Sequence, residues 1–160
     1  MQRAEYASPL GELLLAADGG ALVGLWFRGQ KYEGAGLTGH EPETDETALL
    51  SSVRRWLDAY FSGERPETDF PVAPAGSAFR RRVWRELMAV PYGETLPYGE
   101  LARRVGCASS RAVGGAVGHN PVALIIPCHR IVGSGGALTG YAGGLWRKEA
   151  LLTMEQNCIY

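Results

Sequence analysis

The pattern of apolar residues changes at one point in the chain, the Pro- and Ala-rich stretch over residues 70–76. Before it, short apolar runs separated by Pro and Gly predict an antiparallel sheet. After it, apolar residues recur at the three- and four-residue spacing of short helices. A chain of 160 residues suits one domain or two small ones. We therefore predict two: an N-terminal α/β domain over residues 1–75 and a helical domain over residues 76–160.

The first half predicts strands followed by one helix. Three apolar runs are separated by Pro- or Gly-containing turns: residues 6–7, 13–17 and 22–27. These runs indicate an antiparallel meander. Apolar residues from Leu49 to Phe61 recur at helical spacing, and Gly63 ends that helix. The chain as a whole is therefore expected to be α+β.

The second half predicts short helices. Ser77 is placed to cap the first of them, and Pro97 sets the first turn of the second. A tight turn at Gly106 leads to a third helix, which starts at Arg111 and ends near Gly118. Two short helices joined by a Gly-containing turn form a helix-turn-helix pattern. On its own this pattern is weak support for DNA binding, because many helical hairpins bind nothing.

Charge divides the chain at the same place. Residues 1–75 hold 6 basic and 12 acidic side chains, a net charge of −6, whereas residues 76–160 hold 10 basic and 5 acidic ones, a net charge of +5. This asymmetry suggests that the second half faces a polyanion and the first half does not. The simpler alternative, two surfaces that merely differ in charge, stays open at this point.

Several classes of protein are excluded by what the sequence lacks. No apolar run exceeds five residues, whereas a membrane helix needs about 20, so we expect no membrane span. No apolar stretch follows the N-terminal arginine, so we expect no secretory signal. The three cysteines, at positions 107, 128 and 158, cannot build a disulfide framework. We therefore expect a cytoplasmic protein in a reducing setting.

The third helix is unusual because Gly114 and Gly115 lie in its interior, where each costs about 1 kcal/mol relative to alanine. It also has almost no side chains that could read base edges. Small residues let a backbone approach another surface closely. That surface is either a neighbouring helix or a DNA groove, and in the second case Arg111 is the one long side chain at the start of the helix.

A reactive cysteine lies near the end of the chain. The apolar run Val122–Ile126 is expected to be extended and buried, and it leads to Cys128 and His129. Adjacent side chains diverge on an extended backbone, so cooperation between these two needs a turn or a bridging water. Glu155 falls on the apolar face of the last helix, where a carboxylate needs a partner.

His129 is the natural partner of Glu155. The carboxylate would orient the imidazole, and the imidazole would draw the proton from Cys128, because the thiolate is the nucleophile. The alternatives are a buried structural cysteine beside an incidental histidine, and a Glu155 that is solvated at the end of its helix.

These residues also resemble a known family. The segment Ile126–Ile131, IPCHRI, is similar to the active-site motif of the O6-alkylguanine-DNA alkyltransferases, also called methylated-DNA–protein-cysteine methyltransferases. Further motifs follow in that family's order and spacing: PYGET at 91–95, YGELA at 98–102, RAVGGA at 111–116, NP at 120–121 and YAGG at 141–144. The resemblance covers nearly all of residues 77–155 and the N-terminal half only loosely. It implies a ribonuclease H-like first domain and a winged-helix-like second domain that binds DNA and accepts the alkyl group.

The resemblance implies a DNA repair mechanism. The helix-turn-helix would bind duplex DNA through the minor groove, and the damaged guanine would be flipped out of the stack. Its O6-alkyl group would pass irreversibly to Cys128, so that each molecule acts once. His129 and Glu155 would form the activating network, and Asn120 would brace the turn beside the thiol.

Further residues would touch the DNA or the flipped base. By the same resemblance, Arg111 would fill the gap left by the base, and Tyr98 would crowd the phosphate and donate a proton toward guanine N3. The base pocket would be lined by Tyr141, Ala142 and Ile131. The remaining substrate- or DNA-binding candidates are Gly114, Gly115 and Lys148. Candidate phosphate contacts are Arg80, Arg81, Arg103 and Arg104.

The expected partner is double-stranded DNA carrying O6-alkylguanine, bound by a monomer; activity on O4-alkylthymine is left open. No cofactor is expected. Some relatives bind zinc in the N-terminal half, but residues 1–75 hold no cysteine and one histidine, His40, so no metal is expected there. Two alternatives remain. A non-catalytic sensor of alkylated DNA lacks the acceptor cysteine that is present here, and a cysteine hydrolase needs an oxyanion hole.

Overall fold

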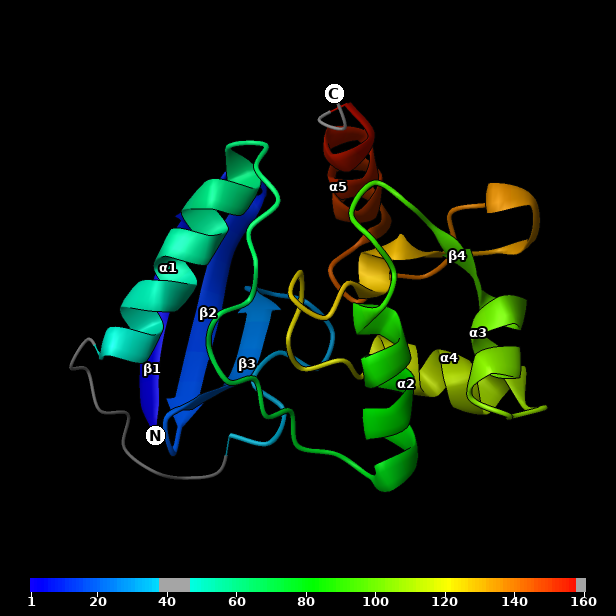
Figure 1. The fold of residues 1–160 in the computed structure, drawn as a ribbon, viewed down its shortest axis with the longest axis horizontal. Helices are drawn as coiled ribbons and strands as arrows, with labels where there is room; N and C mark the ends of the chain where they lie inside the picture. The colour runs from blue at the N-terminus through cyan, green and yellow to red at the C-terminus, as the bar shows by residue number, and fades with distance from the viewer. Residues whose placement is uncertain (38–46, 158–160) are drawn as a thin grey trace. The chain divides into compact units, whose positions relative to one another are not determined.

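The computed structural model describes residues 1–37 and 47–157, which form two compact units. The first unit comprises Met1–Ala75 together with Pro121–Ala123, and the second comprises Gly76–Asn120 and Leu124–Tyr160. In Figure 1 the blue and cyan segments belong to the first unit and the orange and red segments to the second. His40 and Cys158 lie outside the described residues.

The first unit contains a three-stranded antiparallel sheet. β1 (Gln2–Ser8), β2 (Gly11–Asp18) and β3 (Ala21–Phe27) pair in chain order, as the meander pattern predicted. Gly19 and Gly20 form the second turn with positive φ values of 60° and 80°. Glycine adopts this conformation without a steric penalty, so the turn depends on these two residues.

One helix, α1 (Ala48–Phe61), packs along this sheet (Figure 1). The Thr47 hydroxyl accepts a hydrogen bond from the backbone N–H of Leu50 and caps the helix. The buried side chains of α1 are Leu50, Val53, Trp56, Leu57 and Tyr60. Burial of this face stabilises a helix of 14 residues, which would be marginal in isolation.

The outer edge of β3 is covered by two segments that arrive from farther along the chain. Leu22 pairs with Val72, and Leu25 pairs with Val122, each as an isolated parallel bridge. The first bridge pairs Val72, within the Pro- and Ala-rich stretch over residues 70–76, with the edge of the sheet. The second brings the segment around Val122 into the first unit, although its flanking residues belong to the second. Both bridges satisfy backbone groups that an open sheet edge would expose.

The second unit consists of short helices and a small sheet. Its helices are α2 (Ala78–Met88), α3 (Tyr98–Arg104), α4 (Ser110–Gly118) and α5 (Leu145–Asn157). Two-residue strands, β4 (Leu96–Pro97) and β5 (Ile131–Val132), pair in parallel. Two 3₁₀ turns complete the unit: η1 (Cys128–Arg130) and η2 (Ser134–Gly136).

α3 and α4 form the predicted helix-turn-helix and pack on α2. Gly106 turns the chain between them with a φ of 67°. The Ser109 hydroxyl accepts from the Ala112 N–H and caps α4, and Ser77 caps α2 in the same way. Trp84 on α2 donates its Nε1–H to the carbonyl of Ala116 on α4 at 2.8 Å, which fixes the two helices against each other.

The α+β class predicted from the sequence is confirmed by these elements. One local prediction is wrong. The run Val122–Ile126 is buried as expected, but it is not extended, because Leu124 takes a φ of 70° and the chain turns there. A left-handed conformation is costly for leucine, so the surrounding structure imposes it. The apolar pattern alone did not reveal this, because short buried runs look alike whether extended or turned.

Candidate active site

Cys128 lies in one buried turn of the second unit. The residues of η1, Cys128, His129 and Arg130, are 6%, 0% and 8% exposed. Side chains on successive positions of a 3₁₀ turn point in different directions. Within the described residues, Cys128 and His129 form no direct hydrogen bond. The turn therefore does not join the two side chains by itself, and direct proton transfer between them has no hydrogen bond to follow.

Glu155 on α5 joins His129 and Arg130 into one network. His129 Nε2 lies 2.6 Å from Glu155 Oε2. The Arg130 guanidinium donates from Nε to Oε1 at 2.8 Å and from Nη2 to Oε2 at 3.1 Å. Its Nη1 donates to the carbonyl of Val90 at 2.9 Å. Glu155 is fully buried, so it is not a solvated carboxylate at a helix end.

The network determines the charge of each member. Burial acts to raise the pKa of Glu155, but the hydrogen bonds and charges of His129 and Arg130 outweigh it and hold that pKa well below its usual range. Burial lowers the pKa of His129 against the opposing effect of Glu155. The imidazole is therefore neutral near pH 7 and donates from Nε2 to the carboxylate. Its buried Nδ1 has no partner among the described residues and is the basic nitrogen.

The Cys128 thiol is protonated at rest. Burial raises its pKa, and this effect outweighs a hydrogen bond from the Asn120 side chain and the charge of Lys148, which lower it. Asn120 is buried at the end of α4, and its Nδ2 also donates to the carbonyl of Ile126 at 2.7 Å. The amide therefore ties the chain before Cys128 to α4 and favours the thiolate once a base has taken the proton.

The side chain of Lys148, predicted to bind substrate or DNA, points into the second unit. It is fully buried on α5, and its Nζ donates to the backbone carbonyl of Thr139 at 2.7 Å. The side chain of Thr139 in turn hydrogen-bonds Tyr98. Burial raises the pKa of Tyr98, and the nearby Cys128 adds a smaller effect in the same direction, so the phenol keeps its proton. Lys148 thus supports the loop that positions Tyr98 rather than offering a charge at the surface.

The glycines of α4 face open space. A Cβ built on Gly114 or Gly115 would meet no atom within 4 Å. Tight packing on a neighbouring helix is therefore not the reason for these glycines, since that contact is made at Ala116. Arg111 is exposed on the first turn of the same helix. A partner could therefore approach the backbone of α4 closely at Gly114 and Gly115.

The predicted base-pocket residues follow η1 along the chain. Ile131 is fully buried and pairs with Leu96 between β5 and β4. Tyr141 and Ala142 are half-buried. Burial and then the nearby Cys128 raise the pKa of Tyr141 well above its ordinary value, which places its phenol within electrostatic range of the thiol.

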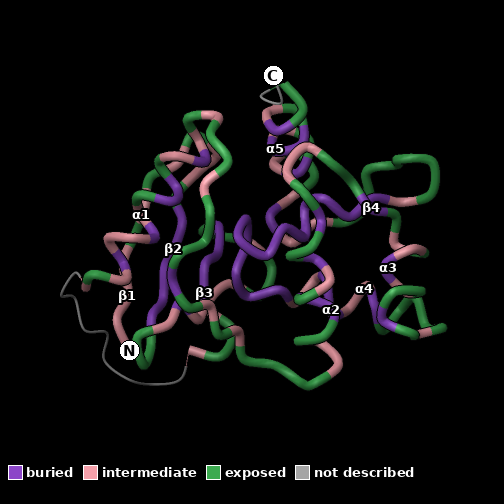
Figure 2. The backbone as a smooth tube through the Cα atoms, viewed as in Figure 1, coloured by how far each residue is buried: buried purple, intermediate pink, exposed green. Residues whose placement is uncertain are grey.

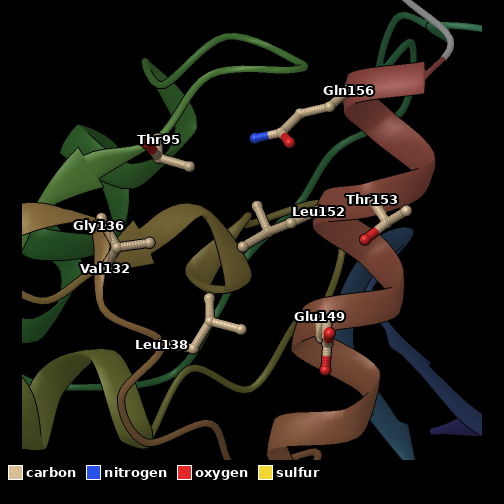
Figure 3. A pocket seen from close by; sticks show the side chains of 8 residues that line it. All are labelled: Thr95, Val132, Gly136, Leu138, Glu149, Leu152, Thr153 and Gln156. Carbon is tan, nitrogen blue, oxygen red and sulfur yellow. The ribbon is translucent and has the colours of Figure 1, made fainter.

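A cavity of about 310 Å³ lies between α5, β5 and the η2 loop (Figure 3). It is lined by Thr95, Val132, Gly136, Leu138, Glu149, Leu152, Thr153 and Gln156. Leu152 projects into it from α5 in the direction of Val132 (Figure 3). None of the residues predicted to be catalytic or to hold the base lines this cavity, so it is distinct from the predicted base pocket.

The described residues form neither a metal site nor a membrane-spanning helix. Within residues 1–37 and 47–157, no three His, Cys, Asp or Glu side chains are grouped so that they could hold a metal ion. No helix in these ranges is long and apolar enough to cross a membrane.

Two residues at the site were missed by sequence reasoning. Arg130 directly follows His129 and comes shortly after a segment expected to be buried. Because a buried guanidinium needs a carboxylate partner, its pairing with Glu155 could have been predicted. Thr139 gave no signal, because its role depends on a loop whose path the sequence does not reveal.

Known proteins match the chain over both units. Residues 1–74 match the ribonuclease-like domain of 6-O-methylguanine DNA methyltransferase, and residues 78–157 match its DNA binding domain. A methylated-DNA–protein-cysteine methyltransferase of Mycobacterium tuberculosis is 44% identical over 151 residues, which cover 94% of this chain and 89% of the relative. One of Methanosarcina acetivorans is 42% identical over 159 residues, which cover 99% and 100%. The crystal structure of Mycobacterium tuberculosis OGT in complex with DNA has a TM-score of 0.88 and 42% identity, covering 99% of this chain and 94% of that one.

Proposed function

Because this chain belongs to the 6-O-methylguanine DNA methyltransferase family, we propose that it repairs DNA by moving the O6-alkyl group of guanine irreversibly onto Cys128. One observation carries the proposal. The Nε2 of His129 is held by Glu155, and its buried Nδ1 is unpartnered among the described residues, in the same turn as the buried thiol. A purely structural cysteine has no need of an oriented base.

Transfer begins with the proton of Cys128. His129 Nδ1 accepts it through a bridging water, and the ionised Glu155 stabilises the imidazolium that forms. Arg130 keeps the carboxylate ionised and in place throughout. The hydrogen bond from Asn120 stabilises the thiolate sulfur.

The thiolate then attacks the alkyl carbon. The carbon–sulfur bond forms as the carbon–oxygen bond breaks, and the electron pair of that bond stays with guanine O6. Tyr98, which keeps its proton, donates toward guanine N3, so the leaving group is neutral guanine. The product is a thioether at Cys128. No group at the site described here reverses a thioether, so each molecule reacts once.

DNA binding is assigned to α3 and α4. The open side of α4 at Gly114 and Gly115 suits close approach to a minor groove. Chemistry on a base requires that it leave the stack, and Arg111 at the start of α4 takes the position of the extruded base. Tyr141, Ala142 and Ile131 line the pocket that receives it.

A titration with excess substrate tests this function. The protein is incubated with increasing amounts of a duplex that carries one O6-methylguanine, and the restored guanine is counted. We expect at most one guanine restored per protein, and none for Cys128→Ala, which still binds the duplex. Several guanines restored per protein would contradict the single reaction. Wild-type protein that binds the lesion without restoring it would instead be a sensor.

A further inference from the structure

α2 carries a row of arginines, Arg81, Arg82 and Arg85, of which only Arg81 was predicted from the sequence to contact a phosphate. Trp84 is buried and hydrogen-bonds Ala116, so the rotation of α2 about its axis is fixed. At about 100° per residue, Arg81, Arg82 and Arg85 fall within one arc of about 100° on the side away from the core. All three are exposed, and Figure 2 shows exposed stretches along α2 beside its buried side.

In the part of the chain that the structure describes, these arginines are not neutralised by an ion pair. The arginines of α3 differ, because Arg103 and Arg104 both pair with Glu100. The arginines on the two helices are therefore unequal: Arg103 and Arg104 of α3 are partly neutralised, whereas Arg81, Arg82 and Arg85 of α2 are not.

Of the three, only Arg85 is favourably placed in α2, because it lies in the last turn, where the helix dipole is negative. Arg81 lies in the first turn, where the helix dipole is positive, and no acidic residue accompanies it there. Arg81 and Arg85 are four residues apart, so their like charges repel on the same face. Three exposed guanidinium groups on one face, with no ion pair among the described residues, form a concentrated positive surface that suits an anionic partner.

We propose that Arg81, Arg82 and Arg85 form a second contact with the phosphate backbone of the duplex held by α3 and α4. The proposal rests on the proposed function, because it extends the DNA-binding surface beyond the helix-turn-helix. α2 packs directly on both of those helices, so its arginines lie in the same unit as Arg111. One guanidinium group can donate two parallel hydrogen bonds to the oxygens of one phosphate, so a row of arginines suits a regular row of phosphodiesters.

The test is the salt dependence of binding. Each phosphate contact contributes about −0.9 to the slope of log K against log salt. The triple variant Arg81→Gln, Arg82→Gln, Arg85→Gln should therefore bind a short undamaged duplex with a slope that is less negative by about 2.7, and with an affinity on the order of 100-fold lower at about 0.15 M salt. Alkyl transfer from free O6-benzylguanine should be unchanged, which shows that the fold and thiol are intact.

A matched control removes the same charge elsewhere. Lys31, Arg55 and Arg65 are exposed in the first unit, and changing all three to Gln should leave the slope within about 0.5 of wild type, since counterions are released only at phosphate contacts. An α2 variant with the wild-type slope would overturn the proposal. The proposal would also be overturned if wild-type protein bound two duplexes and the α2 variant bound one. In that case Arg81, Arg82 and Arg85 would bind a second duplex rather than the one held by α3 and α4. Failure of the proposed function is a separate result: wild-type protein that neither binds duplex DNA nor becomes alkylated.

Discussion

Replacement of Arg130 by methionine should destabilise the protein more than any other single change in the network. Arg130 donates twice to Glu155 and once to Val90, and all of these atoms are buried. Methionine fills much of the volume but leaves the buried charge of Glu155 without the Arg130 guanidinium, with hydrogen bonds from the neutral His129 and the backbone N–H of Gly93. Removing one partner of a buried ion pair costs about 3–5 kcal/mol. That is a large part of the about 5–15 kcal/mol by which a domain is stable.

A double-mutant cycle measures this directly. Urea unfolding at pH 7, followed by circular dichroism, gives the free energy of unfolding of Arg130→Met, Glu155→Gln and the double variant. Since the single change leaves a buried charge that the double change removes, we expect a coupling of about 2 kcal/mol. If Arg130→Met does not fold, the double variant should still fold. Effects that add within about 0.5 kcal/mol would refute the buried pair as the source of the stability.

Three further predictions follow from the same geometry. Glu155→Gln should slow single-turnover alkylation at pH 7 by about 10- to 100-fold, because His129 loses basicity and orientation; an unchanged rate would show that Glu155 takes no part. Arg111→Ala should weaken repair in duplex DNA and barely affect alkyl transfer from free O6-benzylguanine, where no base is extruded; equal losses would mean that Arg111 shapes the pocket or the fold. The free energy of unfolding should fall from about pH 5 to about pH 3, because Glu155 takes up a proton near its ordinary pKa when unfolded but stays ionised when folded. Glu155→Gln should flatten that part of the pH profile, and an identical profile would assign the loss to other carboxylates.

Local elements were predictable from local signals. Ser77 caps α2 because its hydroxyl reaches the N–H three residues on, and this depends on neighbours in sequence alone. The left-handed Leu124 was not predictable, because no residue preference favours it and the surrounding structure imposes it. The glycines of α4 were ambiguous for the same reason: only the packing shows that the space beside Gly114 is open.

Long-range pairing was predictable only where chemistry demanded a partner. Glu155 lies on an apolar helix face, so its carboxylate needed a cation or a hydrogen-bond donor. His129 is such a group, and the sequence therefore predicted this pair. The second partner, Arg130, binds the same carboxylate and lies 25 positions away in the sequence. No periodic pattern of residues predicts that pairing. Lys148 was expected among substrate- or DNA-binding residues, and no sequence pattern revealed that its side chain is fully buried and donates to the backbone carbonyl of Thr139.

The most direct test of the account is the intact mass of the protein after reaction with an O6-methylguanine duplex, followed by peptide mapping. Transfer to the thiol predicts one added methylene, about 14 Da per molecule, located on Cys128. The account would be contradicted by restored guanine with no gain in protein mass, or by a gain that maps to a residue other than Cys128.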